Sequence, residues 1–248
     1  MSHTPKATPS IDDDTQSSAY SETYFDGLYS DNSDPWQYQT RWYEQRKRDI
    51  CLAILPQAKY GNAIELGCGN GVFSSLLARR CQALVSIDGN HKAVQLAEQR
   101  LIDISHVKVI QGVIPNVLLK LKNGLLKAPL LSQLDDVPTY KPPYDLIIIS
   151  EILYYLSPTD IDTVIDWIKH NLAVGGTLLC CHWRYTIDGF AMTGETVHQR
   201  LQQAFNQDKS DCTYPAFTHQ SQLVDSDFLL DIWQNTPKTV AMQENLVG

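Results

Sequence analysis

A glycine-rich turn between an apolar run and a helical pattern constrains the fold of this chain more than any other feature. The apolar run Ala63–Leu66 contains Glu65 and is followed by glycine at positions 67, 69 and 71. Glycine has no Cβ, so the backbone of such a turn can approach a ligand closely. The dinucleotide fingerprint G-x-G-x-x-G needs glycine at position 72, where this chain has Val72. The turn predicts a ligand-binding loop of another kind, and a glycine-rich turn without a ligand is the alternative.

The chain around this turn alternates between strand and helix patterns. Strands are predicted at Ala63–Leu66, Leu84–Asp88, Val107–Ile110, Asp145–Ser150 and Thr177–His182. Helices are predicted at Val72–Cys81, Lys92–Leu101 and Asp160–Leu172, and Gln220–Trp233 is expected to add two strands that turn at Asp225-Ser226. Nearly unbroken apolar strands are typical of a parallel sheet covered on both faces. The pattern predicts an α/β fold with a Rossmann-like, doubly wound, mostly parallel sheet.

The regions outside this alternation differ in composition. Residues 1–19 are rich in Ser, Thr, Asp and Pro, and we predict a disordered tail there. Residues 20–60 are rich in aromatic side chains and are predicted to form an N-terminal helical cover of two short helices, broken at Asp34-Pro35. The main domain is expected at 61–236 and a second tail at 237–248. Within the domain, 115–143 is predicted to be a surface excursion with one helix near Val117–Leu121. The alternative is that its leucines line a substrate entrance or a partner contact.

Length and composition narrow the function. The 248 residues suit one domain with an appended segment, and the net charge of −8 argues against nucleic-acid binding. No apolar run approaches the ~20 residues that span a membrane, and the N-terminus lacks an apolar signal core, so a cytoplasmic location is expected. The six cysteines form no C-x-x-C pair, so we predict no metal site.

Polar residues follow the predicted strands, at the edge where an open α/β sheet binds its ligand. Asp88 lies about twenty residues beyond the first glycine, where a carboxylate can accept both ribose hydroxyls of a nucleoside. The alternative for Asp88 is a turn former. Glu151 is placed to attract a cationic amine and take its proton, and a solvated residue at a helix start is equally open. His182 is a second candidate base, with a packing role equally open.

The N-terminal segment offers two further candidates. Trp36 is a candidate cover for a nucleoside or a sugar face. Arg46 is a candidate bidentate partner of an amino-acid carboxylate. The alternative is an amphipathic helix with Trp42 and Tyr43 packed inward and a charged outer face.

Several short stretches together resemble the class I S-adenosylmethionine-dependent methyltransferases, and among them the nodulation protein S family. These stretches are Tyr24-Phe25, Asp34–Trp36, Trp42–Lys47, Glu65–Gly71, Ser150–Leu156, His182–Arg184, and Gly194 with Val197-His198. The glycine loop is common to the whole class, whereas the flanking blocks are more specific. The resemblance runs from Tyr24 to Trp233.

The resemblance implies S-adenosyl-L-methionine as cofactor and methyl transfer as the activity. The cofactor-binding residues that it implies are Trp36, Arg46, Glu65, Gly67, Cys68, Gly69, Gly71, Asp88, Gly112, Val113 and Ser150. The catalytic residues that it implies are Glu151, Tyr154 and His182. The family commonly has an acidic residue at the position of Val113, so adenine would rely here on apolar packing and backbone groups.

The implied acceptor is a small molecule or a sugar, such as the amine of a deacetylated chitin-type oligosaccharide. Two alternatives stay open: O-methylation of a small metabolite, and a non-catalytic protein that binds the cofactor and a partner. A nicotinamide oxidoreductase is disfavoured by Val72. The sequence makes no prediction of oligomeric state.

Overall fold

A computed structural model describes residues 22–30, 32–122, 140–206, 217–235 and 240–246. The predicted N-terminal tail lies outside the described residues. So do positions 123–139 of the predicted excursion and parts of the C-terminal tail.

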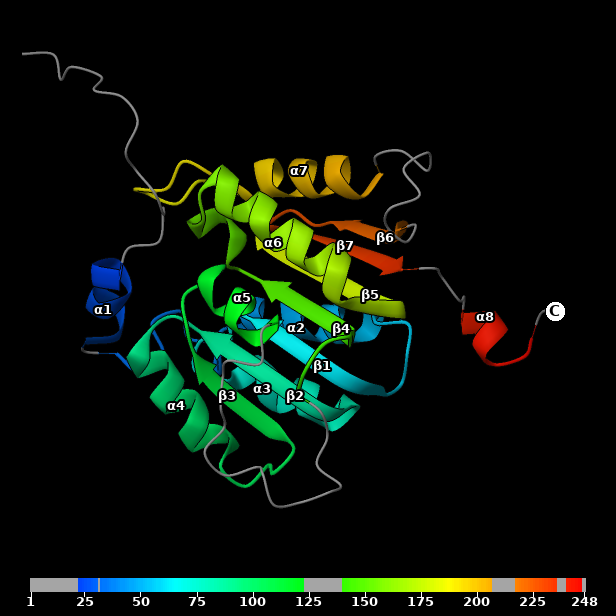
Figure 1. The fold of residues 1–248 in the computed structure, drawn as a ribbon. Coiled ribbons are helices and arrows are strands. Elements are labelled where there is room, and N and C mark those ends of the chain that lie inside the picture. The colour runs from blue at the N-terminus through cyan, green and yellow to red at the C-terminus, as the bar shows by residue number, and fades with distance from the viewer. Residues whose placement is uncertain (1–21, 31, 123–139, 207–216, 236–239, 247–248) are drawn as a thin grey trace, which may run out of the picture.

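The core of the fold is a seven-stranded sheet in the order β3-β2-β1-β4-β5-β7-β6 (Figure 1). Its strands are β1 (Tyr60–Leu66), β2 (Cys81–Asp88), β3 (Val107–Gln111), β4 (Tyr144–Ser150), β5 (Leu172–Trp183), β6 (Phe217–Val224) and β7 (Phe228–Asn235). Strands β1 to β5 are parallel, and β7 runs antiparallel between β5 and β6. The predicted doubly wound, mostly parallel sheet is confirmed.

Helices cover both faces of this sheet. The helices of the described residues are α1 (Glu22–Ser30), α2 (Trp42–Ile54), α3 (Val72–Leu77), α4 (His91–Leu101), α5 (Asn116–Lys122), α6 (Pro158–Asn171), α7 (Gly194–Asn206) and α8 (Val240–Gln243), with 3-10 turns η1 (Ala78–Arg80) and η2 (Leu153–Tyr155). Neighbouring residues of a strand point to opposite faces of the sheet. Ile64 belongs to the buried cluster that contains side chains of α5, α6 and α7, whereas Ala63 belongs to the cluster that contains side chains of α2 and α3. This two-sided burial explains the apolar runs in the sequence.

Local signals set several boundaries. The Asn90 side chain accepts a hydrogen bond from Ala93 N at the start of α4, and Ser157 accepts one from Asp160 N at the start of α6. The fifth strand begins earlier than predicted, at Leu172. The register with β4 shifts between Leu172 and Thr177, and Gly175 and Gly176 lie within the strand.

The predicted N-terminal helical cover is confirmed: α1 lies at the carboxyl ends of the parallel strands, and α2 packs on one face of the sheet (Figure 1) with its first turn at that edge. Phe25 of α1 belongs to the layer of α5 to α7, whereas Cys51 of α2 belongs to the opposite layer. The cover therefore closes the edge of the sheet where ligands bind in open α/β folds. In the described part of the chain, no helix is long and apolar enough to cross a membrane.

Candidate functional site

A cavity of about 470 Å³ lies between the helical cover and the carboxyl ends of β1, β2, β4 and β5. Such a volume suits a small-molecule ligand. Of the predicted site residues, those that line it are Trp36, Gly67, Gly69, Asp88, Ser150, Glu151 and Tyr154. The cavity lies at β1, where the order of the strands in the sheet reverses: β2 and β3 follow on one side of β1, and β4 and β5 follow on the other. This is the switch point at which open α/β sheets bind ligands.

Two glycines form the part of the cavity wall contributed by β1. Gly67 and Gly69 have φ of 81° and 53°, a backbone region that favours glycine. A Cβ at Gly69 would lie 3.3 Å from the Tyr38 ring and 3.5 Å from the Tyr29 hydroxyl. The N–H groups of Gly67 and Cys68 donate to Ile87 O at 2.8 and 2.9 Å, which anchors the turn to β2.

Asp88 connects the end of β2 to this turn. Its Oδ2 accepts a hydrogen bond from Gly69 N at 2.8 Å, and its Oδ1 accepts one from Asn90 N at 2.9 Å. Burial raises the pKa of Asp88, and the backbone donors oppose that rise. A carboxylate offers about four lone-pair sites, so acceptor capacity remains for a ligand.

Two other predicted cofactor-binding positions, Gly71 and Gly112, have packing roles. Gly71, with φ of 77°, lies against α4, where its Cβ would be 3.0 Å from Ala97. A Cβ at Gly112 would lie 2.4 Å from Val117 of α5. Neither they nor Val113 line the cavity, and Gly89 does.

Glu65 and Cys68 lie beneath the turn rather than in the cavity wall. Glu65 is 2% exposed, and its Oε2 accepts hydrogen bonds from Ser74 Oγ at 2.5 Å and Ser86 Oγ at 3.1 Å. Burial raises the pKa of Glu65 to about 7, although the two hydroxyls oppose the rise. The Glu65 carboxylate therefore lies outside the wall of this cavity, where two serine hydroxyls donate to it.

We expect Glu65→Gln to stabilise the protein at high pH. Between its ordinary pKa of 4.5 and the folded value of about 7, the folded state holds a proton that the unfolded chain releases. Stability contributed by Glu65 is therefore lost as pH rises through this window. The variant should gain ~1–3 kcal/mol in free energy of unfolding at pH 8 and little near pH 4.5, by urea denaturation.

Glu98→Gln is the control, because Glu98 is exposed on α4. An equal gain for both variants, or a gain for Glu65→Gln that does not change with pH, contradicts the prediction.

Glu151 is held in one orientation at the end of β4. Its backbone has a left-handed φ of 59°, and its N–H donates to Cys181 O at 2.9 Å. Its Oε2 accepts hydrogen bonds from Tyr154 OH at 2.5 Å and Trp183 N at 2.8 Å. Its Oε1 lies 2.5 Å from the Lys47 ammonium. A left-handed residue other than glycine persists only where its surroundings fix it, and such residues cluster at functional sites.

Tyr154 acts as the donor to that carboxylate. Burial raises the pKa of Tyr154 well above its ordinary value, with the Glu151 charge adding to the rise. The hydroxyl therefore stays protonated at neutral pH.

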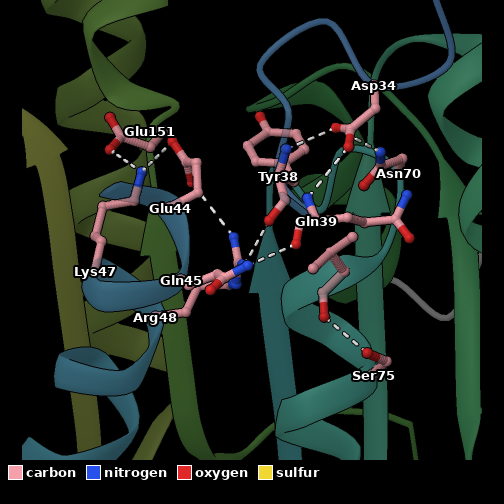
Figure 2. Close-up of polar contacts among 11 residues, drawn as sticks. Asp34, Tyr38, Gln39, Glu44, Gln45, Lys47, Arg48, Asn70, Ser75 and Glu151 are labelled. Atoms are coloured by element: carbon pink, nitrogen blue, oxygen red, sulfur yellow. Dashed lines mark hydrogen bonds and ion pairs between the residues drawn. The ribbon is translucent and has the colours of Figure 1, made fainter. Parts of the chain in front are cut away.

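Helix α2 brings an unexpected set of buried charges to the site (Figure 2). Glu44, Lys47 and Arg48 are all buried, whereas Trp42 is 69% exposed. The alternative considered for this helix, with Trp42 inward and a charged outer face, therefore does not describe Trp42 or these three charged residues. Burial alone lowers the pKa of Lys47, but Glu151 and Glu44 together raise it above its ordinary value.

His182 does not reach the cavity. Its side chain is fully buried, and Nε2 accepts a hydrogen bond from Leu153 N at 3.3 Å. Nδ1 lies 3.1 Å from Nε2 of His198, whose Nδ1 contacts Asp231. Burial lowers the pKa of His182 well below its ordinary value, and His198 and Lys47 add to this. His182 is thus a hydrogen-bonded core residue whose burial favours the neutral form, and the structure does not bring this candidate base to the cavity.

Arg46 is also directed away from the cavity. It forms an ion pair of 2.6 Å with Asp225, and its guanidinium lies 5.7 Å from the Phe228 ring centroid. The cation that the cover contributes to the cavity is Arg41, which forms no ion pair within the described residues. Sequence reasoning missed Arg41 because an exposed arginine before a helix carries no distinctive signal.

Aromatic side chains from the cover form much of the remaining wall. Trp36 packs against Tyr29 and Tyr38, with ring centroids 5.8 and 5.6 Å apart. Tyr43 packs edge to face on Trp183 at 5.4 Å. Among the described residues no cluster suitable for a metal ion is present.

This geometry agrees with the similarity of the chain to known proteins. A protein from Pseudomonas syringae, solved as a candidate methyltransferase, is 34% identical and covers 78% of this chain and 99% of its own, with a TM-score of 0.56. The chain belongs to the class I methyltransferase family. Within that family the profile described as Nodulation protein S (NodS) matches residues 28–125.

Two further relatives carry the nodulation name. The structure of the N-methyltransferase NodS from Bradyrhizobium japonicum WM9 with S-adenosyl-L-homocysteine is 25% identical, covering 86% of this chain and 97% of its own, with a TM-score of 0.64. Nodulation protein S of Sinorhizobium fredii is 29% identical over 142 residues, which are 56% of this chain and 54% of that protein. The chain spans about half the length of the curated relatives it matches. The profile match contains the glycine turn and Asp88 but ends before Glu151.

Proposed function

We propose that this chain transfers a methyl group from S-adenosyl-L-methionine to a small-molecule or sugar acceptor. The observation that carries the proposal is that the glycine turn and Asp88 share one cavity with the fixed carboxylate of Glu151. The part of the cavity at the glycine turn and Asp88 thus suits a nucleoside, and the part at Glu151 suits the acceptor group that takes the methyl.

The residues present fit the cofactor. The cradle at Gly67 and Gly69 leaves no room for side chains, so a ligand can meet the backbone directly. The Tyr29 hydroxyl beside Gly69 is buried without a hydrogen-bond partner in the described residues. Its donor is therefore available to a polar ligand group.

Each wall residue has a distinct role in holding the cofactor. Asp88 accepts the ribose hydroxyls, Arg41 pairs with the amino-acid carboxylate, and Trp36 covers an apolar face. When bound, the cofactor supplies an electrophilic methyl group on a sulfonium. The cover orients the acceptor and excludes water.

The charge of the cavity favours an amine acceptor. Its lining carries the acidic residues Glu44, Asp88, Glu151 and Asp227 and the arginine Arg41. Because Lys47 and Arg48 balance Glu44 and Glu151, the carboxylates of Asp88 and Asp227 remain against Arg41. A carboxylate at Glu151 stabilises positive charge that develops on an acceptor nitrogen, and it can accept the released proton. The resemblance to nodulation protein S favours the amine of a deacetylated oligosaccharide, and the aromatic pair Tyr43–Trp183 suits the apolar face of a sugar ring.

The first test is calorimetric titration with S-adenosylhomocysteine, with NAD as the control. We expect micromolar binding of the first and none of the second. Methyl transfer is then measured by mass spectrometry on glucosamine oligomers and on matched hydroxyl acceptors. No binding of S-adenosylhomocysteine overturns the proposal. Binding with transfer only to hydroxyls overturns the amine assignment, and binding without any transfer favours a non-catalytic protein.

A further inference from the structure

We propose that Lys47 is a positioning residue for this reaction: from the helical cover it fixes the Glu151 carboxylate at the cavity wall and keeps it negatively charged. The inference rests on the proposed function, in which Glu151 faces the acceptor nitrogen. Lys47 belongs to α2 and Glu151 to the end of β4, so the contact couples the cover to the reacting end of the sheet.

The contact is enclosed and shared. The Lys47 ammonium lies 2.5 Å from Glu151 Oε1 and 3.1 Å from Glu44 Oε1, and the Lys47 side chain is 3% exposed. It also lies 4.9 Å from the ring centroid of Tyr43. Figure 2 shows the ammonium between the two carboxylates. With Tyr154 and Trp183 N on the other oxygen, Lys47 completes a set of contacts that leaves Glu151 one orientation.

The network continues from Lys47 to the glycine turn (Figure 2). Glu44 lies 3.5 Å from Arg48, and Arg48 donates to Tyr38 O at 2.5 Å. Tyr38 N donates to Asp34, which also accepts a hydrogen bond from Asn70 of the turn at 3.1 Å. The seating of the cover on the glycine turn and the placement of Glu151 therefore share one set of contacts.

The charge balance explains why the ammonium matters. Two anions, Glu44 and Glu151, are neutralised by Lys47 and Arg48. Burial raises the pKa of Glu44, and Lys47 opposes that rise. Without Lys47, two neighbouring carboxylates share only Arg48, and such a pair takes up a proton nearer neutral pH.

The other titratable groups packed against this pair do not replace the ammonium. They are Tyr38, Tyr43, Tyr154, Tyr155, Cys181 and His182. Burial raises the pKa of each tyrosine and of Cys181, and it lowers the pKa of His182, so all six favour their neutral forms.

The test is Lys47→Met, followed in two ways. Glutamate carboxyl groups are labelled with 13C, the Glu151 signal is assigned with Glu151→Gln, and its titration is followed with S-adenosylhomocysteine bound. We expect the midpoint in Lys47→Met to rise by about one pH unit or more relative to the unsubstituted protein. The apparent pKa of the acidic limb in the pH profile of kcat/KM for a glucosamine oligomer should rise by the same amount. The affinity for S-adenosylhomocysteine should stay within ~3-fold of that of the unsubstituted protein. Lys47→Arg keeps the positive charge, so the apparent pKa of its acidic limb should lie close to that of the unsubstituted protein.

A carboxyl titration and an acidic limb that are unchanged in Lys47→Met overturn the proposal. Arg200→Met is the control, because Arg200 forms its ion pair with Asp162 on the surface, and its limb should stay in place. If Lys47→Met does not fold, the double variant with Glu44→Gln restores charge balance, and its Glu151 titration is compared with that of Glu44→Gln alone. Equal titrations in these two variants overturn the proposal. A protein that transfers no methyl group refutes the proposed function alone, because the carboxyl titration still decides the role of Lys47.

Discussion

Replacing Asp88 with alanine should lower the affinity for S-adenosylhomocysteine by about 100-fold or more, measured by calorimetry. Hydrogen bonds to a charged group are worth ~1.5–3 kcal/mol each, and two ribose hydroxyls would lose their acceptor together. The carboxylate also holds Gly69 N and Asn90 N, so its removal loosens the turn that approaches the ligand. Both effects act in the same direction.

Asp145→Ala is the matched control. Asp145 also accepts a backbone N–H, from Asn62 at 2.9 Å, but it lies at the start of β4 and does not line the cavity. Its variant should bind S-adenosylhomocysteine normally. Unchanged affinity in Asp88→Ala, with the fold intact by circular dichroism, would remove the ribose assignment.

Changing Glu151 to glutamine should lower kcat for an amine acceptor by about 100-fold, within the usual range for loss of a positioned acid–base group. Glutamine keeps the size of the side chain but cannot accept a proton or carry the charge that faces the acceptor nitrogen. Because the substitution leaves the glycine turn and Asp88 in place, S-adenosylhomocysteine affinity should change less than ~3-fold. Single-turnover mass spectrometry separates the chemical step from binding.

Glu195→Gln provides the comparison, because Glu195 pairs with Arg184 and does not line the cavity. That variant should turn over normally. A normal single-turnover rate in Glu151→Gln would exclude this carboxylate from the chemistry and direct attention to Glu44 and Asp227.

The sequence by itself determined the sheet, the edge of the sheet where the cavity lies, and the part of the site formed by the glycine turn and Asp88. Apolar periodicity and the glycine turn are local properties, so they identified β1, the position of Asp88 and the carboxyl edge of the sheet, where the cavity lies. The same local reasoning predicted ligand contacts for two glycines that do not line the cavity. Gly71 and Gly112 are required for packing against α4 and α5, and the sequence pattern does not distinguish that need from a ligand contact.

Only the tertiary structure decided the partners of the charged side chains. Lys47 meets Glu151 across 104 positions, and Arg46 meets Asp225 across 179. His182 lies at a strand end as predicted, yet the enclosing contacts with Leu153 and His198 leave it neutral and away from the cavity. Periodicity specifies which face of an element is apolar, but the protonation and partner of a polar side chain depend on contacts between distant segments.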